Sequence, residues 1–275
     1  MNKLTLQKQV QIISALVEGN SIRATCRMTG AAKGTVLKLL ADVGKACSEY
    51  QDKAFVNLTC KKIQCDEIWS FCYAKEKNVP EDKKDQFGYG NMWTFTAICA
   101  DTKLVPSWRI GRRDIETATE FMEDLAGRLK NRVQLTTDGH RAYLEAVESA
   151  FGYQIDYSQL IKLYGNEGDR EGERKYSPAQ CTGSIKMKIQ GNPDLNHTST
   201  SFVERQNLTM RMSMRRFTRL TNAFSKKAEN LIHAVSLHFM YYNFCRIHQT
   251  LRVTPAMEAG ITDHVWEIEE ILNLQ

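Results

Sequence analysis

Three consecutive segments at the start of the chain have the hydrophobic pattern of helices. Between residues 4 and 18, apolar side chains recur every three or four positions, so they share one face of a helix. Ser21 can cap a second helix over residues 22–28, and a third helix over residues 31–46 follows the turn at Thr29 and Gly30. Two helices joined by a short turn containing glycine, with a packing helix before them, are typical of a helix-turn-helix domain.

The middle of the chain alternates between strand-like and helix-like patterns. Runs rich in β-branched and aromatic residues predict five strands, at residues 62–73, 91–100, 104–110, 133–137 and 152–157. Residues 115–130 and 142–150 have the period of amphipathic helices. The element order predicts an α/β fold with a mixed five-stranded sheet, whose first three strands form an antiparallel meander.

The remainder of the chain is helical after a polar interruption. Residues 158–200 are predicted to be an insertion, in which residues 184–190 alternate like a hairpin strand. A helix over residues 201–219, a second over 224–244 and a last one starting near Pro255 follow. We therefore predict a helix-turn-helix domain at 1–50, a catalytic domain at 60–250 and a helical tail at 251–275.

The charge is small in total but unevenly distributed. The formal net charge is +5, and between Arg205 and Ala228 there are five Arg and two Lys but no acid. Residues 1–50 carry seven Lys and Arg against three acids. Such basic segments favour contact with a phosphate backbone.

The third predicted helix places Lys33, Thr35 and Lys38 near its start, where a recognition helix meets base edges and phosphates. The alternative is a plain three-helix module that binds another protein. We favour DNA binding because the exposed side is basic and the turn is short.

Several classes of protein are disfavoured. No run of about eighteen apolar residues occurs, so no membrane segment is expected. The N-terminal residues lack the apolar core of a secretion signal. Only Cys60 and Cys65 are close in sequence, whereas a structural zinc site usually needs two such pairs. We expect a cytoplasmic protein with reduced thiols.

Three carboxylates stand in positions that suit a metal site. Asp66 lies inside the first predicted strand, Asp138 ends the fourth, and Glu204 lies on the helix after the fifth. A carboxylate inside an apolar strand is costly unless it is paired or holds a metal. Glu67 is the alternative ligand to Asp66, although neighbouring residues of a strand point to opposite faces.

If the first and fourth strands are neighbours, Asp66 and Asp138 meet at one edge of the core, and the helix that bears Glu204 packs beside them. Three of them cannot all ionise comfortably without cations. Magnesium fits, because it prefers carboxylate oxygens and keeps water ligands for substrate phosphates. Two such ions about 4 Å apart would serve phosphodiester cleavage and joining.

Four short strings, in their order and spacing, resemble the transposases of the insertion-sequence-one family. They are Cys-Asp-Glu-Ile-Trp at 65–69, Thr-Thr-Asp-Gly-His-Arg-Ala-Tyr at 136–143, Val-Glu-Arg-Gln-Asn-Leu-x-x-Arg at 203–211, and Arg-Phe-Thr-Arg-x-Thr-x-x-Phe-Ser-Lys at 216–226. The resemblance covers about residues 60–250. It implies an RNase H-like fold and an Asp-Asp-Glu metal triad, which falls on Asp66, Asp138 and Glu204.

The resemblance also implies a function. We expect a DNA transposase that binds the terminal inverted repeats of a mobile element, nicks its 3′ ends and joins them to target DNA with two magnesium or manganese ions. The arginines after Glu204 would grip DNA backbone phosphates near the site; they are Arg205, Arg211, Arg215, Arg216 and Arg219.

Double-stranded DNA is the expected partner, the chain is expected to act as a homodimer or higher oligomer, and its place would be the nucleoid. The alternatives are a non-catalytic, sequence-specific DNA-binding regulator and a simple RNase H-like nuclease that cleaves without joining.

Overall fold

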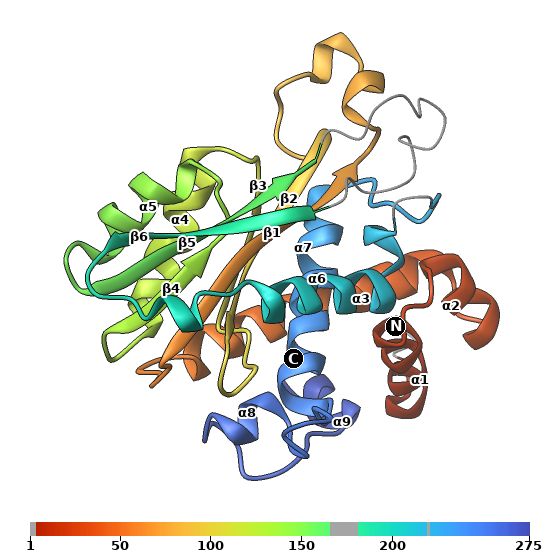
Figure 1. Ribbon diagram of the computed structural model, residues 1–275. Helices are drawn as coiled ribbons and strands as arrows, with labels where there is room; N and C mark the ends of the chain where they lie inside the picture. The colour runs from red at the N-terminus through yellow and green to blue at the C-terminus, as the bar shows by residue number, and fades with distance from the viewer. Residues whose placement is uncertain (1–3, 166–180, 219–220) are drawn as a thin grey trace.

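A mixed sheet of six strands forms the centre of the molecule (Figure 1). The computed structural model describes residues 4–165, 181–218 and 221–275. The strands lie in the order β3-β2-β1-β4-β5-β6. Their bounds are β1 Lys62–Cys72, β2 Gly90–Cys99, β3 Ser107–Gly111, β4 Val133–Thr137, β5 Ile155–Tyr164 and β6 Cys181–Gln190.

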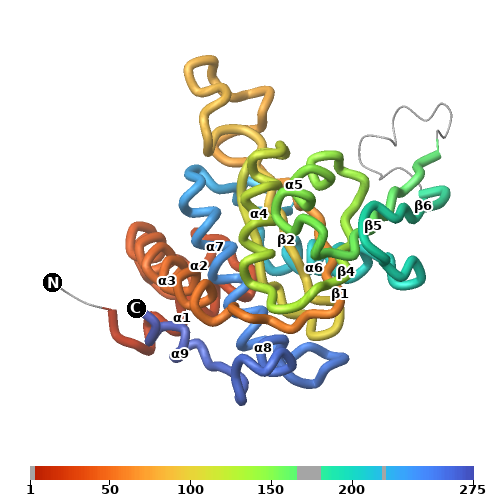
Figure 2. Tube along the Cα trace, turned by 90° about the vertical axis from the view of Figure 1, so that its left-hand side faces the viewer, coloured from red at the N-terminus to blue at the C-terminus, as the bar shows by residue number. Residues whose placement is uncertain are grey.

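Helices cover both faces of this sheet. In Figure 2, α4 and α5 lie in front of the strands and α6 lies behind them. The helices before β4 are α1 Leu6–Val17, α2 Ile22–Thr29, α3 Lys33–Ala54 and α4 Ile115–Arg128. The later ones are α5 Ala142–Phe151, α6 Ser201–Ser213, α7 Ala228–Met240, α8 Pro255–Glu258 and α9 Ile268–Leu272. No helix among the described residues is both long and apolar enough to cross a membrane.

The sheet has an antiparallel half and a parallel half. β1 pairs antiparallel with β2, and β2 pairs antiparallel with β3, which confirms the predicted meander. β4 pairs parallel with both β1 and β5, and α4 and α5 make the crossovers that parallel pairing requires. This mixed arrangement is consistent with an RNase H-like fold.

The sheet has six strands where five were predicted, and its sixth strand, β6, contains the hairpin strand predicted at residues 184–190. β5 continues to Tyr164, well past the predicted end at residue 157, and pairs antiparallel with β6. Beyond Gln159, β5 has no pairing with β4, so its outer part depends on β6 alone. The predicted insertion at 158–200 therefore begins inside a strand and supplies the edge of the sheet, while its residues 166–180 lie outside the described part.

Side chains of β1 point alternately into two cores. Ile63 and Cys65 belong to a cluster that includes Phe121 of α4 and Val147 of α5. Ile68 belongs to a second cluster, formed with residues of α6 and α7. Because the side-chain period of a strand is two, the even-numbered positions of β1 around Asp66 face α6.

The predicted helix over residues 201–219 is shorter in the structure. It ends at Ser213, where Met214 takes an extended conformation, and a short 3-10 turn covers Arg215–Phe217. Met214 and Phe217 are both buried in the core beside α7. Met210, Met214 and Phe217 have the spacing of one helix face, so their apolar pattern by itself does not mark the end of the helix at Ser213. Similarly, α7 begins at Ala228 and passes into a π-helical turn over Tyr241–Cys245.

The N-terminal helices pack against the rest of the molecule. α3 runs to Ala54, beyond the predicted end at residue 46, because Cys47 and Gln51 continue its buried stripe at a spacing of four. Gln51 donates through Nε2 to the carbonyl oxygen of Ser236 in α7. The predicted domain boundary at residue 50 therefore falls inside α3, which packs against α7. The division of the chain into domains stays a prediction.

Gly44 is the point of closest approach between these helices. A Cβ added there would lie 2.6 Å from Cβ of His233, whereas a Cβ at Gly34 of the same helix would meet nothing within 4 Å. We expect Gly44→Ala to lower the free energy of unfolding by about 2 kcal/mol, since overpacking forces the helices apart. Gly34→Ala is the matched control and should be neutral or slightly stabilising. Urea unfolding measures both, and equal stabilities would contradict the α3–α7 packing.

Candidate metal centre beside a basic segment

Asp66 is held between β1 and α6. Its Oδ2 accepts a hydrogen bond of 2.8 Å from Nδ2 of Asn207, and its Oδ1 accepts one of 2.9 Å from the backbone N–H of Glu67. Burial, and after it the charges of Glu67, Asp138 and Glu204, raise the pKa of the Asp66 carboxyl to about 7. The negative charges of the other three acids therefore all act on the carboxyl group of Asp66.

Asp138 reaches the same place from the next strand. In the parallel pairing of β1 and β4, Cys65 lies opposite Thr137, so Asp138 follows at the level of Asp66. The backbone N–H of His140 donates to Oδ1 of Asp138 at 2.9 Å and orients it. Carboxylate oxygens of Asp66, Glu67 and Asp138 lie within 4.8 Å of one another.

Glu204 approaches from the first turn of α6. Oε1 of Gln64 on β1 accepts hydrogen bonds from the backbone N–H groups of Phe202 and Val203 and thereby docks that turn on the sheet. Glu204 lies close enough to Asp66 to raise its pKa, but it is outside the group of three acids within 4.8 Å. Its Oε1 accepts from Nζ of Lys162 at 2.5 Å and from the hydroxyl of Thr200.

Glu67 belongs to the other face of β1. Its side chain is 1% exposed, and its Oε1 accepts from Nε of Arg113 at 2.6 Å. The hydroxyl of Tyr143 donates to its Oε2 at 3.1 Å. Arg113 also lies 3.7 Å from Oδ2 of Asp138. A carboxylate enclosed in this way serves as the counter-ion of Arg113, which favours Asp66 over Glu67 as the ligand.

The donor set suits a hard divalent cation. The three acids of the close group offer carboxylate oxygens as ligands. Oδ1 of Asn207, on the amide that binds Asp66, is buried and has no hydrogen-bond partner. Magnesium and calcium both prefer such ligands, and magnesium keeps waters for phosphate oxygens. The site therefore fits a magnesium ion by its chemistry.

Sequence reasoning missed the side chains that surround the carboxylates. Asn207 lies three residues after Glu204, so helical spacing alone would have placed the two on one face. Lys162 and Arg113 had no such signal, because they come from β5 and from the loop before α4 and meet the acids only in three dimensions.

The predicted DNA-contacting residues are distributed over two regions. Lys33 and Lys38 are exposed and Thr35 half-buried in the first turns of α3. Arg205 and Arg215 are exposed, while Arg211 and Arg216 are half-buried. Arg219 lies outside the described residues.

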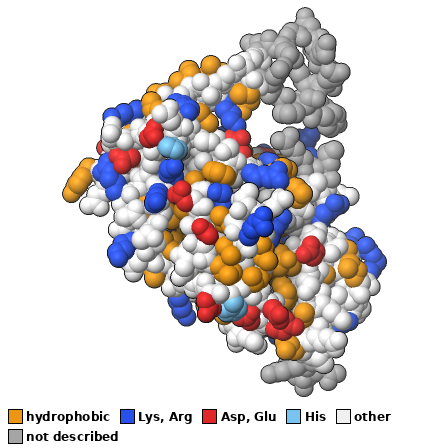
Figure 3. Space-filling view, turned by 60° about the horizontal axis from the view of Figure 1, so that its bottom comes forward, with side chains coloured by type: hydrophobic (Ala, Val, Ile, Leu, Met, Phe, Trp, Pro, Cys, Tyr) orange, Lys and Arg blue, Asp and Glu red, His pale blue; other side chains and the backbone are white. Residues whose placement is uncertain are grey.

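On the face drawn in Figure 3, Lys and Arg side chains lie in several small groups. Hydrophobic and acidic side chains separate these groups among the described residues. The positive charge on this face is therefore divided into separate patches.

Comparisons with known proteins give a limited result. No protein-family model matches the chain, and no curated protein matches it. It is similar to piggyBac transposase in a cryo-EM synaptic complex with hairpin DNA, with a TM-score of 0.45, 10% identity and coverage of 100% of this chain and 72% of that chain.

A second similar structure is the Mos1 strand transfer complex, with a TM-score of 0.25, 12% identity and coverage of 86% of this chain and 76% of that chain. Both TM-scores are below 0.5.

The raised pKa of Asp66 makes stability depend on pH. Because the folded-state pKa of about 7 exceeds the ordinary value of 3.8, the folded protein binds the proton more tightly than the unfolded chain. This contribution is complete below the unfolded pKa and is lost as the pH rises through 7. Without divalent metal, Asp66→Asn should gain stability relative to the wild type between pH 4 and pH 8, by roughly 2–4 kcal/mol.

Urea unfolding in EDTA at a series of pH values measures this difference. The matched control is Asp82→Asn, an exposed acid between β1 and β2, which should follow the wild type at every pH. A constant difference between Asp66→Asn and the wild type across this range would contradict the proposed environment of Asp66.

The Glu67–Arg113 pair gives a second prediction. Arg113→Gln leaves the Glu67 carboxylate buried without its cation, and we expect a loss of about 3 kcal/mol in the free energy of unfolding. The double variant Glu67→Gln with Arg113→Gln should recover most of that loss, because no unpaired charge remains. A double-mutant cycle from urea unfolding measures the coupling, and additive losses would show that the two side chains act independently.

Proposed function

We propose that this chain is a DNA transposase that cleaves and joins phosphodiester bonds at a metal centre of Asp66, Asp138 and Glu204. The proposal is supported by the carboxylate oxygens of Asp66 and Asp138, which lie within 4.8 Å of each other at β1 and the end of β4, and by Glu204 of α6, which is near enough to raise the pKa of Asp66. A long basic segment follows the third acid directly. Acid groups beside a basic surface suit a substrate whose backbone is a chain of phosphates.

Asp66, Asp138 and Glu204 would hold magnesium or manganese, as two ions. When bound, these ions would supply activation of the attacking oxygen and stabilisation of the leaving oxygen. This assignment is supported by the carboxylate oxygens that the site offers as ligands.

The surrounding side chains would position the acids. Asn207 and the backbone N–H of Glu67 orient the two oxygens of Asp66. Gln64 fixes the first turn of α6 and thereby the distance of Glu204 from the sheet. Lys162 neutralises part of the charge on Glu204 and would stand beside a scissile phosphate at the same site.

The remaining parts of the proposal concern DNA. Residues 1–50 would recognise the terminal inverted repeats, with Lys33, Thr35 and Lys38 on the recognition helix. Arg205, Arg211 and Arg215 would contact backbone phosphates near the acids. A homodimer or larger assembly would bring two DNA ends together. Their support is the sequence pattern and the exposure of most of these side chains.

Replacing Asp138 with Asn tests the proposed chemistry. With magnesium and a duplex that carries an element end, the variant should lose strand cleavage by at least ~1000-fold, since one ligand of the ions is removed. It should bind the same duplex with unchanged affinity. Asp82→Asn is the control and should cleave like the wild type.

The assay also separates the alternative functions. Cleavage without transfer of the 3′ end to a target duplex would identify a nuclease. Sequence-specific binding by the wild type with no metal-dependent cleavage would identify a regulator, and full cleavage by Asp138→Asn would refute the metal centre.

A further inference from the structure

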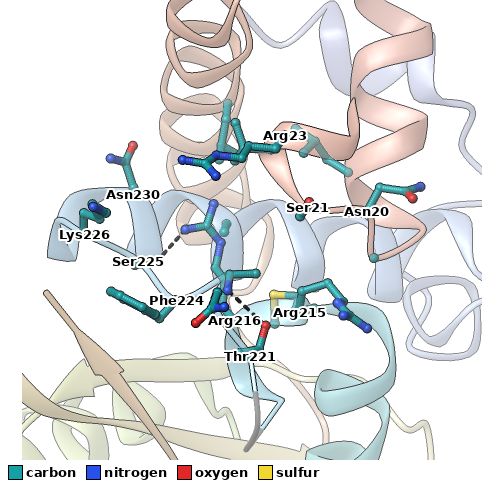
Figure 4. Close-up of a pocket in the computed structure, with 18 of the residues that line it drawn as sticks. Asn20, Ser21, Arg23, Arg215, Arg216, Thr221, Phe224, Ser225, Lys226 and Asn230 are labelled. Atoms are coloured by element: carbon teal, nitrogen blue, oxygen red, sulfur yellow. Dashed lines mark hydrogen bonds between the residues drawn. The ribbon is translucent and has the colours of Figure 1, made fainter. Parts of the chain in front are cut away.

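A cavity of about 1340 Å³ lies between the N-terminal helices and the segment that follows α6. One wall comes from the α1–α2 turn, α2 and the start of α3. The other comes from residues 213–216 and 221–226 and from α7. Figure 4 shows this arrangement, with Arg23 above and Arg216 and Ser225 below. We call it the basic cavity.

The charge of the basic cavity is of one sign. No Asp or Glu occurs among the residues that line it, within the part of the chain that the structure describes. Seven cationic side chains line it, namely Arg23, Arg27, Lys33, Lys75, Arg215, Arg216 and Lys226. Such a concentration of positive charge attracts an anion and disfavours an apolar or cationic ligand.

Burial acts strongly on Arg216, one of these cations. Its guanidinium donates to the neutral hydroxyl of Ser225, and no carboxylate pairs with it among the described residues. Burial lowers its pKa to about 10. A buried charge without a counter-ion is costly, and an anion that enters the cavity would remove that cost.

Arg23 lies across the cavity from Arg216. In Figure 4 the two guanidinium groups extend from opposite walls toward the same space. Two guanidinium groups that face each other with no acid between them can both donate to a phosphate group placed between them. Nε2 of His238, which also lines the cavity, is buried and has no hydrogen-bond partner.

Aromatic side chains complete the lining. Phe224 packs against Phe71 with ring centroids 4.7 Å apart, and Tyr73 lies on the same side of the cavity. Cations that hold phosphates together with aromatic faces that stack on bases are the features of sites for single-stranded nucleic acid. Such a combination is not required for duplex DNA, whose bases are already stacked.

The shape of the cavity points the same way. Small-molecule pockets of roughly 300–1000 Å³ hold ligands of nucleotide size, so this volume admits a few unpaired nucleotides. A paired and stacked duplex cannot bring a base to a half-buried side chain unless a nucleotide leaves the stack.

We propose that the basic cavity binds an unpaired segment of a nucleic-acid strand, with a phosphate between Arg23 and Arg216 and a base against Phe224. This inference rests on the proposed action on DNA. It adds a second site, which is lined by cations where the first is made of acids. The N-terminal helices thereby contribute to holding an unpaired strand as well as to the predicted reading of a duplex.

The test is the binding of fluorescently labelled hexathymidine to the full chain in EDTA, measured by anisotropy. Arg23→Gln and Arg216→Gln should each weaken binding by about tenfold or more, and Phe224→Leu by about fivefold, since a phosphate contact or a stacking surface is lost. Lys53→Gln, an exposed cation on α3 outside the cavity, should stay within about twofold and serves as the matched control.

Arg216→Gln should unfold at the same or a higher temperature than the wild type, because it removes an uncompensated buried cation. Wild-type affinity of the folded Arg23→Gln and Arg216→Gln variants would overturn the proposal. The proposal would also be overturned if the two variants lost affinity equally for a blunt duplex. It would likewise be overturned if hexaglutamate or inorganic phosphate competed for the site as strongly as hexathymidine does.

Asp138→Asn distinguishes the two proposals. It should bind hexathymidine like the wild type while losing metal-dependent cleavage. If the wild type does not cleave DNA but its hexathymidine binding still depends on Arg23 and Arg216, the cavity assignment stands and the transposase assignment fails.

Discussion

The docking of α6 on β1 is the contact on which the candidate site depends. Gln64 and Asp66 lie on the same face of β1, and both bind α6, through its first backbone N–H groups and through Asn207. The carboxylate of Glu204 is carried by the same turn. Loss of this contact would separate Glu204 from Asp66, although neither residue would change.

Electrostatic repulsion sets the second constraint. Four carboxylates, those of Asp66, Glu67, Asp138 and Glu204, lie near one another, and the chain separates them into two groups with different partners. Arg113 neutralises Glu67 on one face of β1, and Lys162 lies beside Glu204 on the other. Burial first, and then the charges of the neighbouring acids, raise the pKa of Asp66 to about 7, and burial also raises the pKa of Glu67. This is the environment in which a divalent cation binds most favourably.

The N-terminal helices are more closely connected to the sheet domain than the charge pattern indicated. α3 packs along α7 with Gly44 against His233, so the two walls of the basic cavity are fixed relative to each other by an apolar contact. The basic segment after Glu204 also divides in two. Arg205 stays on α6, whereas Arg216 lies beyond the end of that helix at Ser213 and lines the basic cavity with Arg23.

The sequence by itself determined the local elements and the candidate acids. Period-two and period-3.6 patterns located the strands of the meander, the crossover helices and the N-terminal helices, since these patterns follow from backbone geometry. Polar residues in apolar strands singled out Asp66 and Asp138. Tertiary structure decided the rest, namely the place of the sixth strand at the edge of the sheet, the length of β5, the end of α6 and the partners of each charge. Those features depend on pairing and burial between residues far apart in the chain, as in Lys162 with Glu204 or Arg113 with Glu67, and local periodicity carries no information about such contacts.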